Sequence, residues 1–385
     1  MSKKSKGEYL STIRERYIKS NKEQKNIILN EFCSICDYNR KYAIRLLNKS
    51  SPKGNNKHSC GRKSVYNSPE ILEFLKTVWI ATNLICSKRL KAIIPLWLPW
   101  YIKDGKKLSK KNSDLLRKIS PATIDRLLKK IRGRYSKQGL STTRPGGLLR
   151  ELVPIKTDQW DETRPGYVEV DTVARCGNSI AGDFVYTLNM VDIATGWTSQ
   201  RAVWGKGEAG VFKAIREIEY LLPFAIRGFD CDNGNELLNW KLLRYFKNRT
   251  NPVSYTRSRA YRKNDNAHIE EKNWTIVRQY IGYDRLEKFE MVEMLNDLYR
   301  NEMNYFLNFF ISSSKLLTKQ RIGSRIKKIH QSHKTPFEKI WQSKFLDESI
   351  KMKLYKLSKT LNPFELNRII KQKIKRILDL AIKQN

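Results

Sequence analysis

Three acidic residues in the middle of the chain have types and positions that suit metal-dependent chemistry on phosphodiesters: Asp171, Asp232 and Glu270. Magnesium and manganese ions prefer hard oxygen ligands. Two such ions held by three carboxylates stabilise both the attacking and the leaving oxygen of an in-line phosphoryl displacement. Each acid taken alone also fits an ordinary cap or a solvated charge. The spacing therefore raises the hypothesis of a metal-using site without deciding it.

The local sequence around each acid indicates why its carboxylate would face a cleft. Asp171 lies in a predicted strand, where alternation places it on the same face as Glu169. Asp232 ends an apolar stretch and precedes Asn233-Gly234, a pair that turns the chain sharply. Glu270 stands in the first turns of a predicted helix, where a negative charge is favourable. Two strand positions and one helix start must therefore converge.

The elements that must position these acids follow a recognisable order over residues 165–290. The hydrophobic pattern predicts strands at 168–173, 184–191 and 198–203, a helix at 208–222, a strand at 226–232, a helix at 236–246, and a strand at 253–256. A further helical pattern runs from 267 to 307. Three strands before the first helix, followed by alternation, is typical of the ribonuclease H-like α/β fold. We expect a multidomain protein with this fold at its centre.

The charge distribution indicates nucleic acid as the partner. The formal net charge is +37, and a field of that sign recruits polyanions. Residues 165–290 carry 18 Lys and Arg against 16 Asp and Glu, whereas residues 1–164 carry 37 against 14 and residues 315–385 carry 19 against 5. A uniformly basic solvated surface would not produce a nearly neutral centre. We therefore expect a catalytic core between two DNA-holding flanks.

Residues 1–50 predict three short helices with a helix-turn-helix outline. The last helix has an apolar side and a basic side, as a groove-reading helix backed by a core would. The predicted DNA-binding residues on that basic side are Arg40, Lys41 and Arg45. A small helical bundle with a basic solvated face remains the alternative.

The rest of the chain divides by composition into four further ranges. Residues 51–68 form a polar linker in which Arg62 and Lys63 either enter a minor groove as a basic arm or belong to a simple tether. Residues 69–135 predict a second helical DNA-binding module, with Ser120-Pro121 as a helix start. A basic linker follows at 136–164, and residues 291–385 predict a basic helical C-terminal region.

The cysteines and the apolar stretches do not favour zinc or a membrane. Cys33-x-x-Cys36 with His58-x-Cys60 offers four potential zinc ligands, but Cys33 falls beside Phe32 on an apolar helix face, which favours a buried cysteine. Six scattered cysteines suit a reducing cytosol. The most apolar stretch, 93–102, is shorter than the roughly 20 residues that span a bilayer.

Four segments resemble the integrase core of bacterial insertion-sequence transposases, in the DDE transposase and retroviral integrase superfamily. The resemblance covers about residues 150–290 closely, and the tail around 319–325 is also similar. The segments that carry it are Pro165-Gly166-Tyr167-Val168-Glu169-Val170-Asp171, Val191-Asp192-Ile193-Ala194-Thr195-Gly196-Trp197, Asp230-Cys231-Asp232-Asn233-Gly234-Asn235-Glu236 and Lys263-Asn264-Asp265-Asn266-Ala267-His268-Ile269-Glu270-Glu271-Lys272-Asn273-Trp274.

This resemblance implies the roles of particular residues. Asp171, Asp232 and Glu270 would be the catalytic residues and the ligands of two Mg²⁺ or Mn²⁺ ions. Retroviral integrases have basic residues four and seven positions after the glutamate, where this chain has Trp274 and Val277. Lys272 and Arg278 are the substitutes that we expect to contact DNA.

The resemblance also implies a function and a setting. The protein would cleave DNA at the ends of an insertion sequence and join those ends to target DNA. It would act as a homo-oligomer on DNA, with no membrane association, in the bacterial cytoplasm near the nucleoid. Two alternatives remain open: a domesticated DNA-binding regulator that has lost catalysis, and a nuclease of the same fold.

Overall fold

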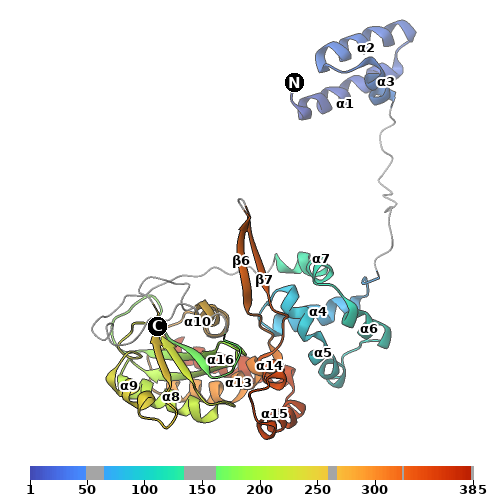
Figure 1. Ribbon diagram of the computed structural model, residues 1–385. Helices are drawn as coiled ribbons and strands as arrows, with labels where there is room; N and C mark the ends of the chain where they lie inside the picture. Colours follow the sequence, from blue (N-terminus) through green and yellow to red (C-terminus); the bar gives the residue numbers. More distant parts are fainter. Residues whose placement is uncertain (49–64, 134–161, 259–266, 323–324, 383–385) are drawn as a thin grey trace. The chain divides into compact units, whose positions relative to one another are not determined.

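The computed structural model describes residues 1–48, 65–133, 162–258, 267–322 and 325–382 (Figure 1). The chain divides into two compact units, Met1–Ser64 and Val65–Asn385. Among the described residues, no helix combines the length and the apolar character needed to cross a lipid bilayer. Arg62 and Lys63, like most of both predicted linkers, lie outside the described residues.

The first unit contains the three helices predicted from the sequence: α1 (Lys3–Lys19), α2 (Lys22–Cys36) and α3 (Arg40–Asn48). Asn21 caps α2, because its side chain accepts a hydrogen bond from the backbone of Gln24. Asp37 has left-handed backbone angles and turns the chain towards α3. A small core joins the three helices and consists of Ile13, Tyr17, Ile28, Leu29, Phe32, Cys36, Ala43 and Leu47. Cys36 is thus part of this core.

A five-stranded mixed sheet forms the centre of the second unit. Its strands are β1 (Tyr167–Ala174), β2 (Val185–Asp192), β3 (Thr198–Trp204), β4 (Gly228–Cys231) and β5 (Ser254–Arg257), in the order β3-β2-β1-β4-β5. β1, β2 and β3 pair antiparallel, and β4 and β5 pair parallel to β1 and to each other in turn. The sequence prediction of three strands followed by alternating helices and strands is confirmed.

Helices cover both faces of this sheet. On one face, Val168 and Val170 of β1 belong to a core with α8 (Glu208–Leu221) and α9 (Trp240–Lys247). On the other face, Val173 belongs to a core with the helices that follow β5. Glu169 and Asp171 alternate with the valines of the first face, so they share the second face.

The helices on the second face continue into a large helical layer. After β5 come α10 (Ala267–Lys272), the π-helical turn η2 (Asn273–Arg278), α11 (Gln279–Ile281), α12 (Glu290–Leu298), the π-helical turn η3 (Tyr299–Met303) and α13 (Asn304–Phe310). Before the sheet come α4 (Pro69–Ala81), α5 (Ser87–Lys103), α6 (Lys110–Lys118) and α7 (Pro121–Arg132). The C-terminal helices are α14 (Pro336–Gln342), α15 (Glu348–Thr360) and α16 (Pro363–Ile382).

One hydrophobic core connects helices from ranges that the sequence analysis assigns to different domains. Trp97 of α5 is fully buried, and its indole Nε1 donates a hydrogen bond of 3.2 Å to the carbonyl oxygen of Phe310. The Trp97 ring also packs edge-on against Phe306 of α13 and Phe364 of α16. Residues 69–132 therefore pack directly on the helices of 291–382.

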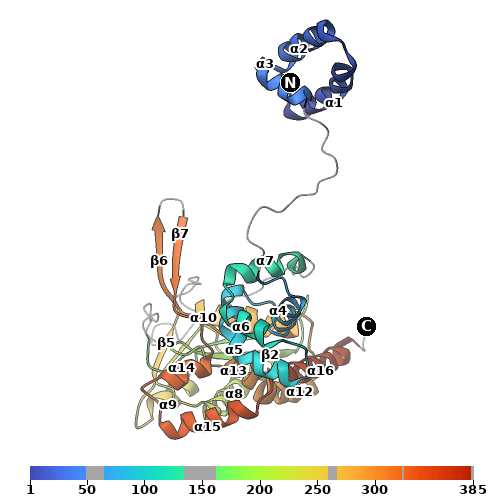
Figure 2. The same ribbon diagram turned by 90° about the vertical axis from the view of Figure 1, so that its right-hand side faces the viewer.

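The C-terminal range also contains a two-stranded antiparallel ribbon, β6 (Leu316–Ile322) and β7 (Arg325–His330), where the sequence analysis expects helix. Its far end extends away from the helices and the sheet in both views (Figures 1 and 2). The ribbon is rich in Lys and Arg, and these residues give neither a high strand propensity nor an apolar face that would be buried. The strand signal in this segment is therefore weak. The expectation of a basic helical region over residues 291–385 is thus corrected at residues 316–322 and 325–330.

Candidate active site

The parallel pairing of β1 and β4 places Asp171 and Asp232 beside each other. Val170 of β1 pairs with Cys231, the last residue of β4, so the residues that follow them, Asp171 and Asp232, are adjacent. Both side chains are half-buried. Asp232 Oδ1 accepts a hydrogen bond of 2.9 Å from the backbone of Gly234, which ties the carboxylate to the turn after β4. Two of the three predicted acids are therefore neighbours because of strand register.

Helix α10, which carries Glu270, is held against the same face of the sheet. At its start, the backbone amide of Ile269 donates a hydrogen bond of 2.9 Å to Glu169 Oε2. Just after its end, Asn273 Nδ2 donates a hydrogen bond of 2.6 Å to Asp171 Oδ2. Asn189 of β2 fixes the amide of Asn273 in turn, through a bond of 2.9 Å to Asn273 Oδ1.

Glu270 lies one helical turn before Asn273, so the two residues share a side of the helix. The Glu270 side chain is exposed. Among the described residues, no group of three or more His, Cys, Asp and Glu side chains is arranged to hold a metal ion. The structure thus brings Asp171 and Asp232 together and places Glu270 on a helix anchored to Asp171, without closing a three-carboxylate cluster in the described part of the chain.

The electrostatics of the pair show uncompensated negative charge. Burial, together with the neighbouring Asp232 carboxylate, raises the pKa of Asp171 to about 7. Burial and the nearby Glu236 carboxylate raise the pKa of Asp232, although its bond to Gly234 opposes this shift. The two carboxylates repel each other where little solvent screens them. A cation bound between them would stabilise their ionised forms.

Glu236 is a part of the site that the sequence analysis did not single out. It is buried, and its Oε1 accepts hydrogen bonds from Thr172 Oγ1 at 2.9 Å and from Lys206 Nζ at 2.8 Å. Lys206 therefore balances the charge of Glu236, whereas the hydrogen bonds that Asp171 and Asp232 accept from described residues come from uncharged groups. In the sequence, Glu236 is recognisable only as an acid four residues after Asp232. Its partners Thr172 and Lys206 come from β1 and from the loop before α8, so local sequence does not show its role.

The donor set at this place fits a divalent cation of the magnesium type. The available ligands are carboxylate oxygens, which hard cations prefer, and the two Asp171 oxygens are oriented by Thr172 N and Asn273 Nδ2. A cation between Asp171 and Asp232 would relieve the repulsion that raises the pKa of Asp171. The residues present therefore fit such an ion.

The acids next to the predicted triad have structural partners. Asp230 is fully buried on β4 and accepts a hydrogen bond of 2.5 Å from Thr256 Oγ1. Asp192 is buried and accepts bonds from Gly166 N, Thr195 N and Thr195 Oγ1. Burial raises the pKa of Asp192 to about 6. Glu271, by contrast, is exposed.

The predicted DNA-contacting residues differ in their surroundings. Arg40, Lys41 and Arg45 are all exposed on α3. Lys272 is half-buried, and burial together with Arg89 lowers its pKa to about 8. Arg278 is half-buried with its guanidinium 4.8 Å from the centre of the Tyr283 ring.

Comparison with known proteins places this chain in a family. No family model matches the sequence. The "Uncharacterized protein y4rM" of Sinorhizobium fredii (strain NBRC 101917 / NGR234) is 39% identical over 336 residues, which cover 85% of this chain and 93% of that protein. The chain belongs to the same family as y4rM.

Among solved structures, three that match this chain are retroviral integrases. The catalytic core of HTLV-2 integrase in complex with magnesium is 14% identical with a TM-score of 0.29, and covers 40% of this chain and 92% of that chain. The intasome of simian T-cell lymphotropic virus is 11% identical with a TM-score of 0.35, and covers 65% and 77%. The catalytic core of BIV integrase is 13% identical with a TM-score of 0.27, and covers 45% and 91%.

Proposed function

We propose that this protein is a DNA transposase or integrase of insertion-sequence type. In this proposal Asp171, Asp232 and Glu270 are the catalytic carboxylates, and they hold Mg²⁺ or Mn²⁺, with two ions at the site. The observation that carries the proposal is the parallel register of β1 and β4, which sets two mutually repelling carboxylates side by side in a chain of net charge +37. A buried repulsion of this kind is costly unless the site uses it.

The reaction consists of two phosphoryl transfers. Water attacks a phosphodiester at the end of the element, and the bond to the 3′ oxygen breaks to leave a 3′ hydroxyl. That hydroxyl then attacks a phosphodiester of target DNA and displaces its 3′ oxygen. Divalent ions at such a site lower the pKa of the attacking oxygen and stabilise the leaving one.

The chain's own residues supply position. Asn273 and the backbone of Thr172 hold one oxygen each of Asp171, so the carboxylate has a fixed orientation. Glu169 anchors the start of α10 and Asn273 anchors its end, which fixes the helix that carries Glu270. Glu236 and Lys206 form a neutral pair beside the site. Such supporting contacts keep catalytic groups within the narrow geometry that chemistry needs.

The DNA-holding parts lie outside the sheet. The exposed basic residues Arg40, Lys41 and Arg45 on α3 suit a groove-reading helix of a helix-turn-helix unit. Residues 69–135 are the second DNA-binding module in this proposal, and the protein works as a homo-oligomer that holds two DNA ends.

The test is the reaction of the purified full chain with labelled duplexes that carry the DNA flanking its own gene. With Mg²⁺ we expect release of a 3′ hydroxyl at the element end and joining of that end to a second duplex. Cleavage without joining would identify a nuclease. Binding of the end duplex with neither product would identify a DNA-binding regulator. Either result would contradict the proposal.

A further inference from the structure

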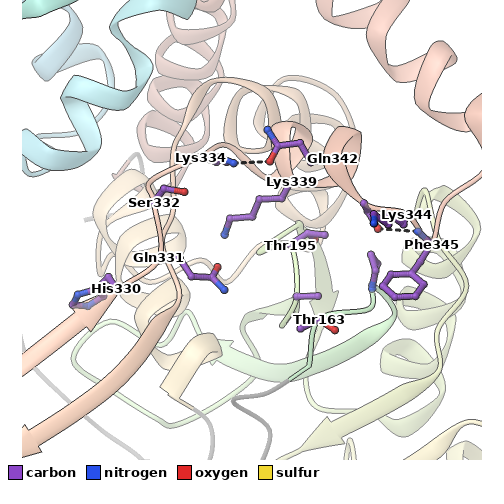
Figure 3. A pocket seen from close by; sticks show the side chains of 13 residues that line it. Thr163, Thr195, His330, Gln331, Ser332, Lys334, Lys339, Gln342, Lys344 and Phe345 are labelled. Carbon is purple, nitrogen blue, oxygen red and sulfur yellow. Dashed lines mark hydrogen bonds between the residues drawn. The ribbon is translucent and has the colours of Figure 1, made fainter.

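A cavity of about 640 Å³ lies at the foot of the β6–β7 ribbon (Figure 3), and its lining includes neither Asp171 nor Asp232. Three segments form it: the residues just before β1, the turn between β2 and β3, and the stretch from the end of β7 through α14. The lining residues that carry polar groups are Thr163, Thr195, His330, Gln331, Ser332, Lys334, Lys339, Gln342, Ser343 and Lys344.

The lining of this cavity is cationic and rich in hydrogen-bond donors. Lys334, Lys339 and Lys344 line it, and among the described residues no Asp or Glu side chain does. Arg164 lies close by, with its guanidinium 5.6 Å from the centre of the Phe345 ring, which is also part of the lining. Hydroxyl and amide groups complete the surface. Such a combination of lysines, hydroxyls and amides suits a phosphate group.

The central lysine of the cavity is held in place and is short of negative charge. Lys339 Nζ donates a hydrogen bond of 3.2 Å to Ser313 Oγ. Burial lowers the pKa of Lys339 to about 8; buried Asp192 opposes this shift, and Lys315, Arg89 and Lys334 add to it. An anion in the cavity would therefore offset both the burial and the repulsion between these cations.

The cavity wall is continuous with the ribbon through backbone pairing. Ser313 and Lys334 exchange two backbone hydrogen bonds, of 2.9 and 3.2 Å. Gln331 N donates to the carbonyl oxygen of Lys315 at 2.9 Å. Lys334 Nζ also donates to Gln342 Oε1 at 2.5 Å, which joins the stretch after β7 to α14. The ribbon and the cavity thus form one connected surface.

The ribbon itself has the charge and shape of a DNA-binding element. Residues 316–337 contain no Asp or Glu, and Lys327, Lys328 and His330 of β7 are exposed. Six residues of β7 span about 20 Å. The major groove of DNA admits a two-stranded ribbon and is about 8.5 Å deep, so the ribbon is long enough to enter it.

We propose that the cavity binds a backbone phosphate of duplex DNA while the β6–β7 ribbon lies in the adjacent groove. This inference rests on the proposed function, since it names the surface that holds the substrate. A volume of about 640 Å³ is larger than a free phosphate ion needs, and it leaves room for the adjoining sugar. The basic ribbon provides the extended contact that a free phosphate or a nucleotide would not use.

The test measures affinity for a labelled duplex by fluorescence anisotropy over a range of salt concentrations, with the full chain and without divalent ions, so that no chemistry occurs. Lys334→Gln, Lys339→Gln and Lys344→Gln each remove one cavity charge. Lys327→Gln and Lys328→Gln each remove one ribbon charge. Lys353→Gln and Lys356→Gln, at exposed positions of α15, are matched controls. Lys339→Arg keeps the charge.

We expect the cavity variants to bind the duplex roughly tenfold more weakly than the controls, and Lys339→Arg to recover much of the loss. The slope of log affinity against log salt should become shallower by about 0.9 for the lost phosphate contact. Because Lys344 is exposed, Lys344→Gln tests the cavity even if Lys339→Gln impairs folding.

Affinities and slopes equal to those of the α15 controls would overturn the inference. A second result would also overturn it. If inorganic phosphate raises the unfolding temperature of the wild type but not of the cavity variants, and the variants bind the duplex as tightly as the wild type, then the cavity holds a free anion and not DNA. Neither result would affect the cleavage reaction of Asp171 and Asp232. Conversely, a chain that binds through this cavity and never cleaves would refute only the proposed function.

Discussion

Asp171→Asn, Asp232→Asn and Glu270→Gln are each expected to reduce cleavage of labelled end DNA by more than about 100-fold. Loss of a group that only supports a metal ligand costs roughly 10–100-fold, and removal of a ligand charge should cost more. The amides keep the shape of the acids nearly unchanged, so DNA binding by the basic flanks should survive. Initial rates with Mg²⁺ and a binding measurement on the same preparations check both expectations.

Two further variants provide cleavage rates with which those of the three amide variants are compared. Glu271→Gln changes an exposed acid next to Glu270 and should leave cleavage near the wild-type rate. Asn273→Ala removes the hydrogen bond to Asp171. Its cleavage rate should lie between that of Glu271→Gln and those of the three amide variants, at a loss of roughly 10–100-fold. Cleavage by Asp232→Asn or Glu270→Gln at the rate of Glu271→Gln would remove the mechanism proposed for this site.

Gly228→Ala is expected to destabilise the central sheet by near the upper end of about 1–3 kcal/mol, because the packed sheet has no space for the added methyl group. A methyl group at Gly228 would overlap the ring of Tyr167, which lies against β4 from its position in β1. That ring cannot move freely, since Tyr167 Oη shares a hydrogen bond of 2.9 Å with Thr256 Oγ1 of β5. Thr256 in turn holds Asp230, so the change would disturb three strands at once.

The measurement is the free energy of unfolding in denaturant, with Gly210→Ala as the matched control. No atom lies within 4 Å of a methyl group built at Gly210, which is in helix α8. Alanine there should stabilise the chain by about 0.5–1 kcal/mol, because glycine is a poor helix former. Equal free energies for the two variants would show that Tyr167 does not pack over Gly228 as described.

The order of strands and helices along the chain, and the placement of the two aspartates on a strand face and at a strand end, could be predicted from local sequence. Alternation within Tyr167–Ala174 and the turn signal after Asp232 are both short-range features. They place each carboxylate on a face or at an edge, and parallel pairing then brings the edges together. The positions of Asp171 and Asp232 can therefore be predicted from sequence, because the strand pattern and the turn residues that determine them lie within a few residues of each aspartate.

The supporting residues could not be predicted in the same way. Asn273 bonds to Asp171 across 102 positions of sequence, and Glu236 bonds to Thr172 across 64. No local pattern distinguishes these side chains from solvated polar residues. The contact between Trp97 and Phe310, 213 positions apart, likewise depends on how helices pack and not on their periodicity. These contacts depend on tertiary packing between segments that are far apart in the sequence.

The ribbon was missed for a different reason. Its strands alternate only weakly in sequence, since Lys and Arg interrupt the apolar residues in both of them. Prediction of strands relies on the alternation of apolar and polar residues, and this segment offers little of it. A basic two-stranded ribbon is therefore hard to identify from its sequence pattern.

The central claim is that Asp171 and Asp232 form a divalent-ion site, and thermal unfolding of the full chain against pH tests it most directly. The pKa of Asp171 is raised from 3.8 to about 7, so its contribution to stability is complete below about pH 4 and is lost as the pH rises through about 7. Wild type without divalent ions should lose stability between about pH 4 and 7, relative to Asp171→Asn. Mg²⁺ at pH 8 should restore it in wild type and have little effect in Asp171→Asn. Parallel pH profiles and equal Mg²⁺ shifts in the two proteins would contradict the claim.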